Sequence, residues 1–521
     1  MKFIVNPITV FIFLIVLGSC KNKEQKSATT VETTNMEYYR EPYRPQFHFS
    51  PEEKWMNDPN GMVYHKGIYH LFYQYHPDDI VWGPMHWGHA TSRDLVHWEH
   101  KPIALFPDEH GYIFSGSAVF DKNNTSGFGT SDNPPLVAIF TYHLVEGEKA
   151  GKTDFQTQGI AYSLDNGDTW TKYEGNPVIG NQGIRDFRDP KVMWHEASRK
   201  WVMTLVAGDH AKFYGSKDLK QWEQLGEFGK AKGAHGGVWE CPDLISLKVE
   251  GSEEEKWVLL ISVNPGAPNG GSGTQYFIGD FDGNTFTTNQ EETKWIDWGT
   301  DNYAGVTFSN TPKGEHIFLG WMSNWTYAQV TPTEKWRSAM TLPRKLSLRK
   351  VDGKYELFNY PIDGFPIMDM GKLDNEIFLK PGKEMTFKYA ELNTSEIAFK
   401  TTLNDYKIGI DNQMGDALFL IFDAENNKLR LDRSNSGKVD FHENFGSPIQ
   451  EMPLENLPKE EFEVRIVLDL SSIEIFLNKG QYVMTAQIFP NTPYKRITFS
   501  NNSSKNHSFN KYRMQLIERV W

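Results

Sequence analysis

Ser-Arg-Asp-Leu at residues 92–95 leads to Trp98, and two later stretches repeat this order of serine, aspartate and tryptophan. These are Ser-Leu-Asp-Asn-Gly-Asp-Thr at 163–169 before Trp170 and Ser-Lys-Asp-Leu at 216–219 before Trp222. Serine and aspartate favour turns, because their side chains bond to the nearby backbone. Each stretch therefore predicts a hairpin that closes one β-sheet before the next sheet begins.

The spacing of these turns indicates the kind of repeat. A fourth turn at 281–286 follows the three, so the turns recur roughly every 50 to 70 residues, which suits the four-stranded blades of a β-propeller. Residues 43–350 then have room for about five blades. Chance recurrence of common turn residues is the alternative to this interpretation.

The rest of the chain predicts an all-β protein with two domains. Short β-type runs such as 136–142 are separated by Gly, Pro, Asn and Asp, and no stretch shows a long helical period. Towards the C-terminus, strands with alternating apolar residues appear, for example at 462–470. We expect a β-propeller at 43–350, a linker at 351–366 and a β-sandwich at 367–521.

The N-terminus predicts export. An apolar run at 3–17 is too short for a confident membrane span but suits a signal peptide. It ends in Leu-Gly-Ser before Cys20, which resembles the lipobox of bacterial lipoproteins. We expect a signal peptide at 1–20, a flexible tether at 21–42, and a lipoprotein at the cell surface or the periplasmic face of the outer membrane. Contact with the membrane would be made only by the lipid on Cys20. A plain secretory signal or a short anchor is the alternative.

The charge balance excludes one large class of partner. The chain has 521 residues, with 54 Lys and Arg against 67 Asp and Glu, and a formal net charge of −13. Phosphate binding requires clustered basic residues, so no nucleic-acid partner is expected. Two cysteines are too few for a disulfide framework or a cysteine-rich zinc site. His86 and His89 have no further ligands at a suitable spacing, so no metal is expected.

Three carboxylates stand in unusual surroundings. Asp58 precedes Pro-Asn-Gly, Asp189 lies between Arg188 and a proline, and Glu240 lies between a tryptophan and a cysteine. Their structural alternatives are a turn, an exposed ion pair and a buried hydrogen-bonded glutamate. Apolar surroundings raise the pKa of a carboxyl, which suits Glu240 as a general acid, and an arginine keeps a carboxylate ionised. One ionised and one protonated carboxyl among tryptophans indicate glycoside hydrolysis.

Four ordered motifs carry a family resemblance. They are Trp-Met-Asn-Asp-Pro-Asn-Gly at 55–61, Phe-Ser-Gly-Ser at 114–117, Phe-Arg-Asp-Pro at 187–190 and Trp-Glu-Cys-Pro-Asp at 239–243. With them, residues 43–521 closely resemble glycoside hydrolase family 32, the β-fructofuranosidases, which include invertases, inulinases and levanases. The resemblance implies a five-bladed β-propeller followed by a C-terminal β-sandwich, and a reaction that needs no cofactor.

The resemblance also implies roles for the matching residues. Asp58 would be the nucleophile of a retaining reaction, Glu240 the general acid/base, and Asp189 would stabilise the transition state by binding sugar hydroxyls. The fructosyl pocket would be lined by Asn57, Gln74, Trp82, Phe114, Ser115, Arg188 and Trp321. Trp87 and Trp325 are weaker candidates for its wall.

The substrate is indicated by further similarities. Gly-Gly-Ser-Gly-Thr-Gln-Tyr-Phe at 270–277 and Gly-Trp-Met-Ser-Asn-Trp at 320–325 are more similar to bacterial fructan hydrolases than to invertases. We therefore expect exo-acting hydrolysis of fructan polysaccharides or fructo-oligosaccharides (levan, inulin or both) with release of fructose. An endo-acting levanase, a non-catalytic fructan-binding lipoprotein, and an arabinan-cleaving or sialidase-type propeller are the alternatives. The sandwich is expected to brace the propeller rather than to bind sugar.

Overall fold

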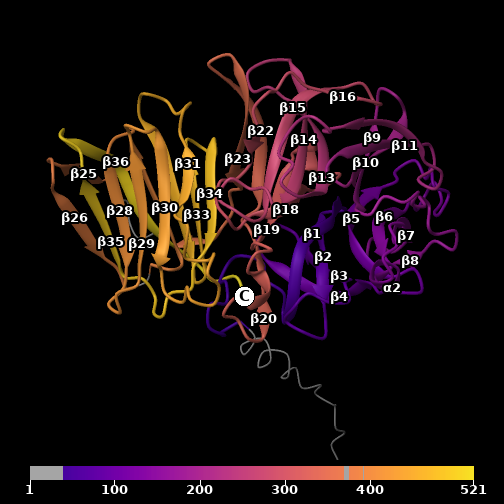
Figure 1. Cartoon of the computed structure of the whole chain (residues 1–521), viewed down its shortest axis with the longest axis horizontal. Coiled ribbons are helices and arrows are strands. Elements are labelled where there is room, and N and C mark those ends of the chain that lie inside the picture. Colours follow the sequence, from indigo (N-terminus) through magenta and orange to yellow (C-terminus); the bar gives the residue numbers. More distant parts are fainter. Residues whose placement is uncertain (1–38, 369–374, 391) are drawn as a thin grey trace, which may run out of the picture.

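The computed structural model describes residues 39–368, 375–390 and 392–521. The predicted signal peptide with Cys20, and most of the predicted tether at 21–42, lie outside the described residues. Two β-rich bodies stand side by side, and the chain builds the propeller before it builds the sandwich (Figure 1). Within the described ranges, no helix is long and apolar enough to cross a membrane.

Five sheets form the blades of the propeller in the described part of the chain. The first two blades contain β1 (Lys54–His65), β2 (Ile68–His76), β3 (His86–Ser92), β4 (Trp98–Leu105), β5 (Tyr112–Phe120), β6 (Leu136–His143), β7 (Gln156–Ser163) and β8 (Thr171–Lys172). The next two contain β9 (Phe187–His195), β10 (Lys200–Ala207), β11 (Ala211–Ser216), β12 (Glu223–Phe228), β13 (Val238–Lys248), β14 (Glu255–Asn264), β15 (Gly273–Phe281), β16 (Phe286–Thr287) and β17 (Lys294–Trp295). The fifth contains β18 (Tyr303–Thr307), β19 (Ile317–Met322), β21 (Ala339–Met340), β22 (Arg344–Val351) and β23 (Lys354–Pro361). Short helical segments are α2 (Val145–Lys149), η1 (Pro312–Gly314) and η2 (Ala328–Val330).

The first strand of each blade lies at the centre of a closed ring. β1, β5, β9, β13 and β18 pack against one another in this order, and β18 also packs against β1. The short β20 (Trp336–Arg337) pairs in parallel with Lys54 and Trp55 of β1, which ties the end of the propeller to its beginning. The closed ring leaves only short, protected edges and brings five strand ends together.

The repeated turns lie between the third and fourth strands of successive blades, as the sequence predicts. In the first blade the Leu95 amide donates to the Ser92 hydroxyl, and the Trp98 indole donates to the Leu95 carbonyl at 3.2 Å. The third blade repeats both bonds at 216–222, and the second has a related arrangement at 163–170. These side-chain bonds are local, which is why the sequence pattern alone reveals the hairpins.

Two further sheets form the sandwich. One contains β24 (Ile367–Met368), β25 (Asn375–Leu379), β27 (Ser395–Thr401), β32 (Phe462–Asp469), β33 (Ser472–Leu477), β34 (Tyr482–Gln487) and β36 (His507–Ile517). The other contains β26 (Glu384–Lys388), β28 (Tyr406–Asp411), β29 (Ala417–Asp423), β30 (Lys428–Asn435), β31 (Gln450–Pro453) and β35 (Arg496–Asn501). Buried residues alternate with half-buried ones along β29 and along most of β30, and residues of both sheets pack into a shared core. The predicted fold class, a propeller followed by a sandwich, is confirmed.

The predicted linker at 351–366 is wrong over much of its length. After β22 ends at Val351 and the chain turns, β23 pairs with β22 along its whole length as the outer strand of the fifth blade. Pro361 lies at the end of this edge strand, where proline interrupts no inner ladder of hydrogen bonds.

Buried charges join the two domains. Arg344 of β22 donates to Asp297 at 2.9 Å and to Glu474 of β33 at 2.6 Å. His48 bonds to Glu474 at 2.9 Å and to Asp469 at 2.8 Å. Because each of these buried charges has a partner of opposite sign, the interface avoids the large penalty of an isolated buried ion. The network holds the sandwich against the propeller.

Candidate active site

Residues near the starts of the inner strands meet in one pocket of about 270 Å³. The predicted residues that line it are Asn57, Asp58, Gln74, Trp82, Phe114, Ser115, Arg188, Asp189 and Glu240. Residues that the sequence did not single out complete the wall, namely His143, Glu148, Phe155, Gln156, Asp186 and Gln329. All five blades contribute, since the fifth supplies the loop that contains Trp325 and Gln329.

The inner strands lose their pairing register where they reach this pocket. The register shifts fall at 56–59 in β1, 113–116 in β5, 188–191 in β9, 240–243 in β13 and 303–306 in β18. A β-bulge bends the strand and re-aims a side chain, and bulges are common beside active sites. Asp58, Ser115 and Asp189 all lie inside such shifts. The irregular backbone there allows their side chains to point into the pocket.

The backbone at three of these breaks is strained. Asp189, Cys241 and Ala304 have φ angles of 64°, 45° and 53°, in the left-handed region that residues other than glycine rarely adopt. The Asp189 amide donates to Thr141 Oγ1, and Asp189 Oδ2 accepts the Cys241 amide, each at 3.0 Å. Such strain persists where surrounding contacts impose it, and it is concentrated at functional sites.

Asp58 is surrounded by hydrogen-bond donors. Its Oδ1 accepts Asn57 Nδ2 at 2.9 Å, its Oδ2 accepts the Ser115 hydroxyl at 2.7 Å, and Cys241 Sγ lies 3.5 Å from the same oxygen. Burial raises the pKa of Asp58 and the charge of Glu240 raises it further, whereas the bonds from Asn57 and Ser115 lower it. The donors therefore fix the orientation of a carboxylate whose charged form is disfavoured by burial.

Glu240 has polar partners instead of the apolar surroundings that its sequence neighbours suggested. Its Oε1 accepts Nε and Nη2 of Arg188 at 3.1 and 3.0 Å, and its Oε2 accepts the Tyr303 hydroxyl. Trp239 is fully buried on the other side of the strand and donates to the Ala234 carbonyl. Burial raises the pKa of Tyr303 far above its usual range, so the phenol stays protonated and acts as the donor.

One guanidinium serves several carboxylates in the pocket. Besides Glu240, Arg188 binds Asp186 Oδ1 at 2.7 Å, and its Nε lies 4.0 Å from Asp189 Oδ2. Burial raises the pKa of Asp189, the charge of Arg188 lowers it, and the charges of Glu240 and Asp58 raise it again. Arg188 is the one lysine or arginine among the described residues that line the pocket. A site with this excess of negative charge stabilises positive charge that develops on a bound substrate.

Two family comparisons match most of the chain. The glycosyl hydrolases family 32 N-terminal domain matches residues 48–361, and the family 32 C-terminal domain matches residues 379–515. The chain belongs to glycosyl hydrolase family 32. It is therefore a glycoside hydrolase, as the four motifs predicted.

Similar proteins place it within the family. It is 47% identical over 479 residues to a levanase of Bacillus subtilis (strain 168), covering 90% of this chain and 69% of the levanase. It is 41% identical to an extracellular exo-inulinase of Aspergillus awamori, covering 87% and 91%. The crystal structure of exo-inulinase from Aspergillus awamori superposes with a TM-score of 0.84 at 37% identity, covering 93% and 100%. A β-fructofuranosidase from Schwanniomyces occidentalis complexed with fructosyl-erythritol gives 0.82 at 33% identity, covering 92% and 98%.

The prediction that Trp321 lines the pocket of this family 32 enzyme is wrong. Trp321 is fully buried beneath the pocket, where it packs against Trp55 and Trp325 with ring centroids 6.1 and 4.9 Å away. Trp325, the weaker candidate, lines the pocket instead. Trp87 is also fully buried, and its indole donates to the Phe114 carbonyl. The sequence could not distinguish these tryptophans because burial depends on how the blades pack.

A buried histidine and glutamine form part of the wall that the sequence missed. Gln156 Oε1 accepts the Phe187 amide at 2.7 Å, so its Nε2 is the group that donates to His143 Nδ1 at 3.1 Å. His143 Nε2 is then free to donate to Glu148 at 3.2 Å, and burial lowers the pKa of His143. The neutral ring stacks on Phe114 at 4.2 Å. His143 and Gln156 are directly opposite each other on β6 and β7. This pairing could have identified them as neighbours in the wall, but only if the register of the hairpin had been known.

Proposed function

We propose that this family 32 hydrolase cleaves the β-fructofuranosidic linkages of fructans, and that it removes fructose from chain ends with retention of configuration. Levanase and exo-inulinase relatives that match most of the chain support the substrate class. The observation that carries the proposal is the placement of Asp58 and Glu240 in one pocket, each carboxyl held by its own set of hydrogen-bond donors.

The size of the pocket supports action at chain ends. Its volume of about 270 Å³ lies just below the usual range for ligand sites, about 300–1,000 Å³. The segment that contains α2 and Phe155 walls one side, and the loop with Trp325 and Gln329 walls another. Such a pocket holds a terminal sugar, whereas endo-cleavage needs a groove that is open at both ends.

The chemistry follows from the two carboxyls. Asp58 attacks the anomeric C2 of the terminal fructosyl unit, and the proton on Glu240 passes to the glycosidic oxygen as the bond to the leaving sugar breaks. Glu240, now ionised, accepts a proton from water. That water attacks C2 of the fructosyl-enzyme, releases fructose and regenerates the Asp58 carboxylate. Two displacements at the same carbon retain its configuration.

The surrounding groups prepare these steps. Ser115 and Asn57 aim the Asp58 carboxylate, and Arg188 with Tyr303 holds Glu240 in place. Asp189, fixed by the Cys241 amide, is positioned to accept hydroxyl groups of the sugar ring. Groups held in this way need no reorganisation as charge develops, which lowers the barrier.

Product analysis tests the mode of action. The full chain is incubated with levan, inulin and sucrose, and the products are separated by chromatography at early times, with Glu240→Gln as the blank. We expect fructose alone from the first time point. A ladder of oligosaccharides from levan would establish the endo mode instead. Turnover by Glu240→Gln equal to that of the natural chain would contradict the assignment of the acid/base.

Export as a lipoprotein is part of the proposal and rests on the sequence around Cys20. A lipid anchor would hold the enzyme where an extracellular polymer is met. The test is fractionation of cells that express the natural chain or Cys20→Ser. We expect the natural chain with the membranes and the variant released. Equal release of both would favour a plain secretory signal.

A further inference from the structure

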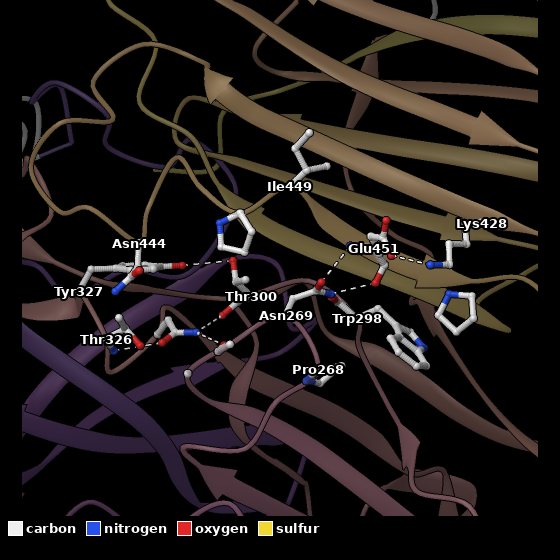
Figure 2. Close-up of a pocket in the computed structure, with 15 residues that line it drawn as sticks. Pro268, Asn269, Trp298, Thr300, Thr326, Tyr327, Lys428, Asn444, Ile449 and Glu451 are labelled. Carbon is white, nitrogen blue, oxygen red and sulfur yellow. Dashed lines mark hydrogen bonds and ion pairs between the residues drawn. The ribbon is translucent and has the colours of Figure 1, made fainter. Parts of the chain in front are cut away.

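Three polar residues join the inner strands that carry the groups around Glu240. Lys191 lies on β9, Asp243 on β13 and Thr307 on β18. Asp243 and Thr307 are buried, and the Lys191 side chain is only 11% exposed. None of the three lines the active-site pocket, and none lines the cavity of about 740 Å³ between the propeller and the sandwich (Figure 2). Any part that they play in the reaction must therefore act through other residues.

Three donors converge on one oxygen of Asp243. Its Oδ2 accepts the Thr307 amide at 2.6 Å and the Thr307 hydroxyl at 2.7 Å, and it lies 3.1 Å from Lys191 Nζ. Lys191 Nζ also donates to the Thr307 carbonyl at 2.5 Å. Because β13 packs between β9 and β18 in the ring, Lys191 reaches past β13 to the backbone of β18. The bonds therefore close a triangle among three strands, the Lys191–Asp243–Thr307 triangle.

The triangle stands directly after three matching bulges. β9, β13 and β18 each have one extra residue relative to the strand beside them, within 188–191, 240–243 and 303–306. Arg188, Glu240 and Tyr303, which meet at the Glu240 carboxyl, are the last paired residues before these bulges. The members of the triangle stand at the point where pairing resumes, or one residue after it. The same three strands are thus joined on both sides of their bulges.

An ion pair of this kind is a poor source of stability. Taking Lys191 and Asp243 out of water costs about as much as their attraction returns, so apolar residues of similar size often serve folding equally well. Asp243 Oδ1 adds a further cost, because it is buried and has no hydrogen-bond partner among the described residues. What the pair provides is a fixed geometry, since its bonds to the Thr307 backbone hold β18 in one register against β13.

We propose that Asp243 is a positioning residue for the acid/base: through the triangle it holds the bulges in the register that places Glu240 against Arg188 and Tyr303. The inference rests on the proposed role of Glu240. Asp243 acts through the backbone of β13 and β18 and does not contact the substrate. A bulge that is free to shift moves the Glu240 carboxyl, and a displacement of about 1 Å is enough to lower a rate about 10²-fold.

The first measurement is steady-state kinetics of the full chain on inulin or sucrose. Asp243→Asn keeps the size of the side chain and weakens the triangle, and Thr307→Val removes one bond but leaves the ion pair intact. Ser309→Ala is the matched control, because it removes a hydroxyl from the same segment whose bond goes to the Ala118 carbonyl of β5. We expect kcat to fall about 50-fold in Asp243→Asn and about fivefold in Thr307→Val, with KM within about twofold and Ser309→Ala unchanged.

β-Fructofuranosyl fluoride supplies a readout that a merely structural role would not change. Fluoride leaves without a proton, and added azide attacks the fructosyl-enzyme without a base, so this reaction does not need Glu240. With azide present, we expect Asp243→Asn and Thr307→Val to turn over the fluoride within about twofold of the natural chain. Glu240→Gln is the benchmark and should show the same selective loss on the natural sugars.

The outcomes separate this inference from the proposed function. If Glu240→Gln shows the selective loss but Asp243→Asn and Thr307→Val lose activity on both kinds of substrate equally, or lose none, the inference is refuted and the function stands. If Asp243→Asn does not fold, Thr307→Val decides by the same comparison. If Glu240→Gln itself loses activity on both kinds of substrate equally, the proposed acid/base is wrong and the inference is overturned with it.

Discussion

The active-site pocket and the domain interface are both clusters of buried carboxylates, but they are compensated differently. At the interface, Asp297 and Glu474 share Arg344, and Asp301 pairs with Arg433 at 2.6 Å. In the pocket, Asp186, Asp189 and Glu240 share Arg188, and Asp58 is bonded to the neutral side chains of Asn57 and Ser115. At the interface every carboxylate has a cationic partner, which gives a rigid joint, whereas the sparser compensation in the pocket leaves carboxyls poised for proton transfer and attack.

The pKa directions show the same contrast. Burial raises the pKa of Glu474, but Arg344 and His48 outweigh burial and bring it to about 2. In the pocket, burial and the neighbouring Glu240 raise the pKa of Asp58. The ionised form of Glu474 therefore contributes to the stability of the folded protein. The ionised form of Asp58, which the reaction needs, lowers that stability instead.

The largest expected effect is on catalysis. Asp58→Asn keeps the size of the side chain and removes the nucleophile, so kcat on fructan should fall about 10⁴-fold or more. The Tm should stay level or rise, because a buried carboxylate that repels Glu240 has been removed. Steady-state kinetics and thermal unfolding measure both. Loss of activity together with a large fall in Tm would mean that Asp58 is structural.

The interface should give the next largest effect, on stability. Arg344→Met leaves Asp297 and Glu474 buried without their cation, which should lower the free energy of unfolding by about 3–5 kcal/mol. Arg349→Met removes an arginine from an exposed pair with Glu250 and should change it by less than about 1 kcal/mol. Urea unfolding compares the two variants. Similar losses of unfolding free energy in the two variants would show that burial does not determine how much an ion pair contributes to stability.

The pH dependence of stability should come from His48. Burial alone would lower the pKa of His48, but its bonds to Asp469 and Glu474 raise it to about 9 from an ordinary 6.5. Its contribution, on the order of 3 kcal/mol, is therefore complete below pH 6.5 and is lost as the pH rises through 9. Unfolding at pH 6 and pH 10 should show this loss in the natural chain and a much smaller one in His48→Gln. Parallel curves would exclude His48 as the source.

Two matched tyrosines should give the smallest effects and separate the regions most sharply. Tyr303→Phe removes the donor to Glu240, so kcat/KM should fall about tenfold, which corresponds to about 1.4 kcal/mol. Tyr327→Phe removes a hydroxyl that bonds to Asp301 and Arg433, so the free energy of unfolding should fall by about 1–1.5 kcal/mol with normal kinetics. A loss of stability in Tyr303→Phe and a loss of activity in Tyr327→Phe would contradict the assignment of Tyr303 to catalysis and of Tyr327 to the domain interface.

Local patterns explain the success of the sequence analysis. The turns at 92–98 and 216–222 are held by bonds between close neighbours, so their residues identify the hairpins and hence the blades. The motifs around Asp58 and Asp189 identify candidate carboxylates, and the structure places both in the pocket. Trp321 was misplaced because an aromatic residue in a motif has no local sign of burial, which the neighbouring blade supplies.

The sequence by itself determined the repeated β-hairpins, the family and the carboxylates. Only the tertiary structure decided the partners of each carboxylate. Arg188 and Tyr303 reach Glu240 from 52 and 63 residues away, and Arg344 reaches Glu474 from 130 residues away. The reason is physical: turns depend on bonds between neighbours in the chain, whereas charge compensation and burial depend on which strands the closed ring and the domain interface bring together.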